Sequence, residues 1–101
     1  MERGTTPQHT FNIPADISPA IKEVKITYAQ DGKEILVKRT ADCTLEPGKI
    51  ITKLTQEDTF LFNSNKLVHI QIRVLTLGGD CVKSQVLTTS AGACLDNEVL
   101  V

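Results

Sequence analysis

The feature that most constrains the fold is a strict alternation of apolar and polar residues between positions 68 and 74. The apolar positions of this stretch are Val68, Ile70, Ile72 and Val74. Successive side chains of a β-strand point to opposite faces, so the alternation predicts a strand with one buried and one solvated face. The same pattern at Val24, Ile26 and Tyr28 predicts a second strand of this kind.

Turn signals separate the other segments that are suited to strands. Asp31-Gly32, Glu46-Pro47-Gly48 and Gly78-Gly79-Asp80 each combine residues that tolerate positive φ or begin a tight turn. Between them we expect strands over 9–13, 33–39, 49–54 and 81–90, with Ile35 and Val37 on one face of the second of these. About seven short strands in one chain are typical of a two-sheet sandwich.

One segment departs from this pattern and predicts a short helical crossover near residues 55–62. Thr55 is a good N-cap, and Asp58 three residues later completes a capping box. The helix can continue for only about one turn before Asn63-Ser64-Asn65 ends it. We expect Phe60 and Phe62, or Leu61, to fill the end of the core.

The order of these elements indicates the topology. A strand, a helical crossover, a long alternating strand and a hairpin to the last strand correspond to the E, F and G strands of an immunoglobulin-like fold. The 101 residues suit one domain, 1–101, with an extended arm over 1–8 and a tail over 91–101. The sequence therefore predicts a single all-β, immunoglobulin-like antiparallel sandwich, although Trp and the usual cysteine pair between the sheets are missing.

Composition argues against several classes of partner. The 11 Lys and Arg and 12 Asp and Glu residues give a net charge of −1, which does not favour a nucleic-acid partner. No apolar run approaches the roughly 20 residues of a membrane span, and residues 1–14 do not resemble a secretory signal. The three cysteines fit small, partly buried apolar residues of a chain made in a reducing cytoplasm, while a disulfide between two of them stays open.

We find no pattern that indicates catalysis, a cofactor or a metal. His9 and His69 fit solvent-facing positions on strands, without a nucleophile beside them. Neither histidine has a ligand spacing from a cysteine, and Asp96 and Glu98 lack a loop that could supply the remaining oxygens for calcium. The sequence predicts a protein that is not an enzyme.

The two ends of the chain are candidates for docking to a partner. Three aliphatic residues, Val99-Leu100-Val101, stand at the C-terminus. They either fold back on their own sheet or dock on another chain by strand addition or groove filling. The candidate partner-docking residues are Arg3, Phe11, Val99, Leu100 and Val101.

Several segments resemble a known group of proteins. They are Arg3-Gly4-Thr5-Thr6-Pro7, His9-Thr10-Phe11, Ile26-Thr27-Tyr28-Ala29-Gln30, Leu54-Thr55-Gln56-Glu57-Asp58-Thr59, Ile70-Gln71-Ile72-Arg73-Val74-Leu75-Thr76 and Cys94-Leu95-Asp96-Asn97-Glu98-Val99. Their pattern resembles small virion or baseplate-associated structural proteins of Firmicutes phages and prophages. The later half is similar in layout to the N-terminal sandwich domain of upper baseplate proteins.

The resemblance implies a function without a catalytic residue to transfer. A virion structural or accessory protein of the tail, baseplate or head decoration would act by protein–protein contacts in a symmetric assembly. Its partners would be other virion proteins or repeated copies of itself, in a virion assembled in the host cytoplasm. The alternative is a stand-alone adhesin or carbohydrate-binding β-sandwich module, with a solvent-facing cluster around Tyr28 or of loop residues.

Overall fold

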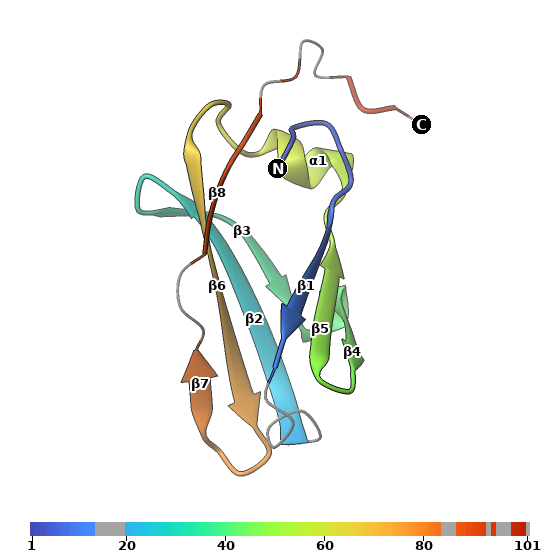
Figure 1. Cartoon of the computed structure of the whole chain (residues 1–101), viewed down its shortest axis with the longest axis vertical. Helices are drawn as coiled ribbons and strands as arrows, with labels where there is room; N and C mark the ends of the chain where they lie inside the picture. The colour runs from blue at the N-terminus through green and yellow to red at the C-terminus, as the bar shows by residue number, and fades with distance from the viewer. Residues whose placement is uncertain (14–19, 84–86, 93, 95–97, 101) are drawn as a thin grey trace.

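The protein is a two-sheet β-sandwich with one short α-helix (Figure 1). The computed structural model describes residues 1–13, 20–83, 87–92, 94 and 98–100. The strands are β1 (Gln8–Asn12), β2 (Ile21–Gln30), β3 (Lys33–Arg39), β4 (Cys43–Glu46), β5 (Lys49–Lys53), β6 (Leu67–Thr76), β7 (Cys81–Lys83) and β8 (Leu87–Ser90). The helix α1 spans Gln56–Phe60, and a 3₁₀ turn over Thr40–Asp42 links β3 to β4.

The strand order confirms the predicted class of fold. One sheet has the order β1-β5-β4, and the other has the order β3-β2-β6, with β7 and β8 both on the second edge of β6. All of these pairings are antiparallel. The two orders correspond to B-E-D and C′-C-F-G of an immunoglobulin-like sandwich, with α1 at the E–F corner.

The core forms where the alternating faces of β2 and β6 meet the three-stranded sheet. Ile26 pairs with Ile72 and Tyr28 with Ile70, so their side chains lie on the same face. The buried apolar set is Phe11, Val24, Ile26, Tyr28, Ile50, Leu54, Phe62, Val68, Ile70, Ile72, Val74 and Ala91. Fully burying a large apolar side chain contributes about 1.5–3 kcal/mol, so this cluster supplies most of the favourable free energy of folding.

The predicted turns are present, and a register shift near one of them determines which side chains of β3 face the core. Asp31 and Gly32 both have positive φ, at 51° and 75°, as a two-residue hairpin turn requires. The pairing of β2 with β3 shifts its register between Tyr28 and Ala29, just before this turn. Leu36 is therefore opposite Tyr28, and Lys38 is opposite Ile26. The inner face of β3 therefore carries Leu36 and Lys38, whereas Val37 lies beside Thr27 on the outer face.

The predicted crossover begins and ends as its residues suggest. The Asp58 amide donates to Thr55 Oγ1 at 3.1 Å, and the Thr55 amide donates to Asp58 Oδ2 at 2.9 Å, which completes the capping box. Phe62 is 1% exposed and fills the end of the core, whereas Leu61 is 54% exposed.

The strand predicted over residues 81–90 is described only in part. Within this range the structure describes two strands, β7 over Cys81–Lys83 and β8 over Leu87–Ser90, both paired with β6. Residues 84–86, which the prediction also placed in this strand, lie outside the described residues.

Candidate functional site

The N-terminal arm is docked against its own sandwich. The amide of Arg3 donates to the carbonyl of Gly92 at 3.2 Å, and the Gly92 amide donates to the carbonyl of Met1 at 2.8 Å. Further along, the carbonyl of Pro7 accepts a hydrogen bond from the Leu54 amide at 2.9 Å. These bonds join the arm to the end of β8 and to the start of the crossover, so residues 1–8 do not extend freely into solvent.

Two of the predicted docking residues are engaged inside the chain. The Arg3 guanidinium lies 5.5 Å from the centre of the Phe60 ring, and its Nη2 donates to the Phe60 carbonyl at 3.4 Å. Its Nε is buried without a hydrogen-bond partner. Phe11 is 8% exposed and belongs to the core, so it does not offer a surface to a partner. The alternation of β1 puts Phe11 inside, next to solvent-exposed Thr10 and Asn12.

A side chain of α1 binds the backbone of the C-terminal tail. The Leu100 amide donates to Gln56 Oε1 at 2.8 Å, and Gln56 Nε2 donates to the Leu100 carbonyl at 2.7 Å. The side-chain amide thus pairs with the tail as a neighbouring strand would. The Leu100 side chain is 71% exposed, Val99 is half-buried, and Val101 lies outside the described residues.

One margin of the sandwich carries a free edge beside exposed apolar side chains. Among the described residues, no strand pairs with the second edge of β1. Val82 pairs with Val74 and Leu87 with Ile70, so both lie on the inner face of the five-stranded sheet. They are nevertheless 42% and 51% exposed. The three-stranded sheet ends at β1, and Figure 1 shows β7 and β8 at the margin away from β4 and β5.

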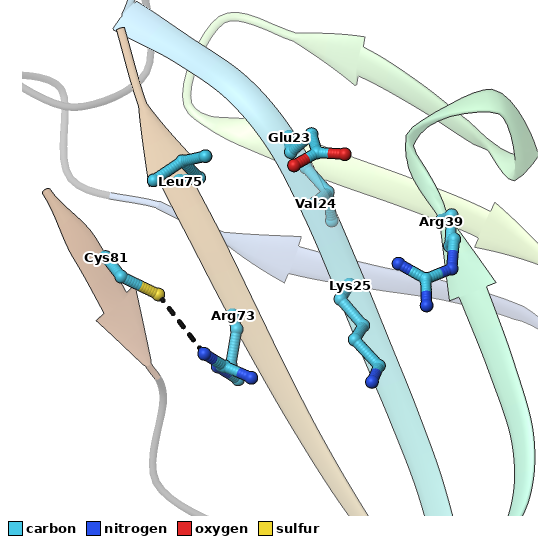
Figure 2. A pocket seen from close by; sticks show the side chains of 7 residues that line it. All are labelled: Glu23, Val24, Lys25, Arg39, Arg73, Leu75 and Cys81. Atoms are coloured by element: carbon cyan, nitrogen blue, oxygen red, sulfur yellow. Dashed lines mark hydrogen bonds between the residues drawn. The ribbon is translucent and has the colours of Figure 1, made fainter. Parts of the chain in front are cut away.

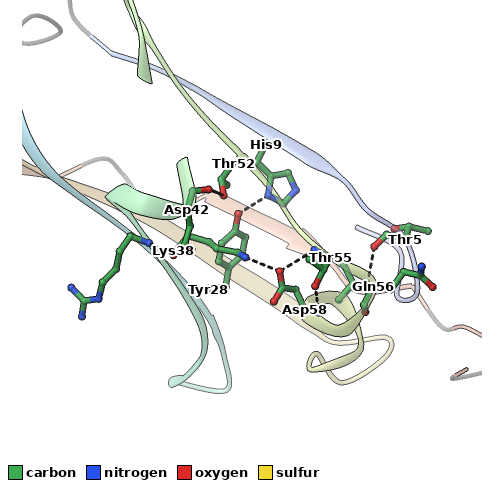
Figure 3. Close-up of polar contacts among 11 residues, drawn as sticks. Thr5, His9, Tyr28, Lys38, Asp42, Thr52, Thr55, Gln56 and Asp58 are labelled. Carbon is green, nitrogen blue, oxygen red and sulfur yellow. Dashed lines mark hydrogen bonds and ion pairs between the residues drawn. The ribbon is translucent and has the colours of Figure 1, made fainter. Parts of the chain in front are cut away.

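A polar contact between the sheets replaces the predicted solvent-facing histidine at position 9. His9 Nδ1 lies 2.6 Å from the Tyr28 hydroxyl (Figure 3). Burial, and then the positive N-terminus, lower the pKa of His9, while burial, Cys43 and Asp58 raise the pKa of Tyr28. Both shifts favour the uncharged forms, so the contact joins a neutral imidazole to a neutral phenol. The prediction was wrong for His9 because this residue lies on the same inner face of β1 as Phe11, where it meets Tyr28 of the opposite sheet.

A second polar contact joins β3 to the crossover. Lys38 Nζ lies 2.7 Å from Asp58 Oδ2, and both side chains are largely buried (Figure 3). Burial favours a raised pKa for Asp58, but the hydrogen bonds from Lys38 and Thr55 outweigh it and lower the pKa. The pair satisfies polar groups at the end of the core.

The outer face of the five-stranded sheet carries a basic row. Arg39, Lys25, Arg73 and Lys83 are successive cross-strand neighbours on β3, β2, β6 and β7. A hollow of about 420 Å³ lies over Arg39, Lys25 and Arg73 of this row and is lined also by Glu23, Val24, Leu75 and Cys81 (Figure 2). Alternation alone places Lys25 and Arg73 on outer faces, but only the register brings all four residues into one line.

The structure also bears on a disulfide, a metal site and a membrane span. No disulfide joins any two of Cys43, Cys81 and Cys94, so the pairing left open by the sequence is not formed. The described residues contain no group of three His, Cys, Asp or Glu side chains placed to hold a metal ion. Within the same residues, no helix has the length and apolar character needed to cross a bilayer.

Comparison with known proteins is negative at all three levels. No family model matches the sequence, no curated protein is similar to it, and no solved structure matches the fold.

Proposed function

We propose that this protein is a bacteriophage virion structural or accessory component that acts through protein–protein contacts in a symmetric assembly. The observation that supports the proposal best is the free edge of β1 beside the exposed inner-face residues Val82 and Leu87. Unpaired backbone groups at a sheet edge accept an added strand, and apolar side chains next to the edge give that strand a surface to cover.

The geometry indicates what kind of segment this margin accepts. In an immunoglobulin-like sandwich, a further strand precedes the B strand and covers the inner face near the G strand. Here β1 takes the B position, and the arm leaves it to reach Gly92 instead of continuing the sheet. The partner is therefore an extended segment of a neighbouring chain, with apolar side chains at alternate positions. Covering Val82 and Leu87, each already about half-buried, adds about 2 kcal/mol to its main-chain hydrogen bonds.

The test is incorporation into virions of the phage that encodes the chain. Peptide mass spectrometry of gradient-purified particles should detect the wild-type chain, and the double variant Val82→Ser, Leu87→Ser should be depleted from them. Leu45→Ser with Leu61→Ser is a matched control, because these residues are 43% and 54% exposed, Leu45 lies on β4 at the edge of its sheet opposite β1, and Leu61 follows α1. Absence of the wild-type chain from particles contradicts the virion role. Equal depletion of both double variants contradicts the assignment of the contact surface.

The alternative of a carbohydrate-binding module loses one of the two surfaces that were predicted for it. That alternative predicted a solvent-facing cluster around Tyr28 or among loop residues, but the Tyr28 side chain is 0% exposed and lies against His9 and Phe62. Sugar rings stack on exposed aromatic faces, which this residue does not present.

A further inference from the structure

The basic row of Arg39, Lys25, Arg73 and Lys83 concentrates positive charge that the described residues around it balance only in part. Each member lies directly opposite the next, on strands about 4.8 Å apart, so the row is roughly 14 Å long. Like charges directly opposite one another destabilise a sheet. A bound anionic group between them would remove that repulsion.

Among the described residues, few acidic side chains form ion pairs with the basic row. In the described structure, Lys25 is the only member with an ion pair, 3.6 Å from Glu34, whose side chain is 58% exposed. Arg73 Nη2 contacts Cys81 Sγ at 3.7 Å, a weak interaction that leaves its other donors available. Figure 2 shows Arg39 and Arg73 on either side of Lys25 along the hollow. Two guanidinium forks that flank an ammonium suit carboxylate groups, which Arg binds in bidentate fashion.

The surroundings of the row distinguish between classes of polyanion. Glu23 lines the same hollow and Glu34 stands beside Lys25, so a chain with an anionic group in every repeat would meet repulsion. The chain's one Tyr and three Phe provide no platform for bases, because Phe11, Tyr28 and Phe62 are buried and Arg3 covers Phe60. A polypeptide avoids both problems, since it can place carboxylates over the cations, polar groups near Glu23 and an apolar side chain on Leu75.

We propose that the outer face of the five-stranded sheet binds an acidic, extended polypeptide segment of a neighbouring protein through Arg39, Lys25, Arg73 and Lys83. This inference rests on the proposed assembly function and specifies the chemistry of a second partner surface, on the opposite face from Val82 and Leu87. Carboxylates at every second residue of an extended segment are about 6.8 Å apart on one face, so two or three of them fall within the row.

The experiment is a titration of the purified chain with synthetic peptides, in which binding is measured by calorimetry or fluorescence anisotropy. The probe carries glutamate at alternate positions with threonine between, and the reference peptide has glutamine in place of glutamate. We expect the glutamate peptide to bind at least tenfold more tightly than the glutamine peptide. The double variant Arg39→Ser, Arg73→Ser should weaken this binding about tenfold, and added salt should weaken it further.

A charge-matched control separates the row from net charge. Lys49→Ser with Lys53→Ser also removes two exposed positive charges, but from β5 in the other sheet, and should change binding less than twofold. Equal losses in the two double variants would overturn the inference, as would equal binding of the two peptides. Tighter binding of a thymidine oligonucleotide or of heparin would assign the row to another class of polyanion. A negative titration with normal incorporation into particles removes this inference and leaves the proposed function standing.

Discussion

Replacing Gly4 by alanine tests whether the N-terminal arm is part of the folded structure. Gly4 has a φ of +79°, and a Cβ at this position would lie 3.0 Å from Phe60 Cζ and 3.1 Å from Cys94 Sγ. The left-handed conformation costs an alanine about 1–2 kcal/mol. Overlap with well-packed neighbours adds about 1–3 kcal/mol if the arm stays in place. The loss in the free energy of unfolding cannot exceed the free energy of docking the arm, because the arm can detach from the sandwich.

Gly32→Ala is the matched control for this substitution. Gly32 has a nearly equal φ of +75°, but no atom lies within 4 Å of the position of its Cβ. It therefore carries the conformational cost alone, which for a chain of this size corresponds to a fall of about 4–8 °C in Tm per kcal/mol. Gly4→Ala should lower Tm further, and the difference between the two variants measures the packing of the arm.

Amide exchange identifies where the lost stability comes from. The Leu54 amide donates to the Pro7 carbonyl at 2.9 Å, so it reports on the docked arm. Its protection should fall in Gly4→Ala and persist in Gly32→Ala. Equal losses of Tm in both variants, with Leu54 protected in both, would refute the docking of the arm through Gly4.

Two further predictions concern buried polar groups. The lowered pKa of His9 means that folding favours the neutral ring, so stability is complete above the unfolded pKa of about 6.5 and decreases as pH falls below it, by at most about 2 kcal/mol at pH 5. Urea unfolding at pH 7.5 and 5.0 should show this decrease in the wild type and a smaller one in His9→Gln, and equal decreases would contradict it. Gln30 is 1% exposed and exchanges two hydrogen bonds with the Asn63 backbone, at 3.0 and 2.8 Å, so Gln30→Leu should cost about 2–4 kcal/mol. The same change at Gln56, near the surface, should cost less than about 1 kcal/mol in the same urea assay, and equal costs would refute the role of Gln30.

Local patterns in the sequence determined the class of fold. The apolar alternation in β2 and β6, the turns at Asp31-Gly32 and Gly48, and the capping box of Thr55 and Asp58 are all present where they were predicted. Each depends on residues within a few positions of one another, so single-chain reasoning can identify it. Phe11 shows the limit of this local reasoning. The strand around Phe11 was predicted correctly, but the burial of Phe11 under the opposite sheet was not.

Only the tertiary structure decided which surfaces are available to a partner. Strand register brings Arg39, Lys25, Arg73 and Lys83 into one row, although they are spread over nearly sixty positions of the chain. The exposure of Val82 and Leu87 depends on where the three-stranded sheet ends, which alternation cannot indicate. Both features arise from pairings between distant segments. A sequence pattern specifies the two faces of a strand, whereas its neighbours determine which face and which edge remain open.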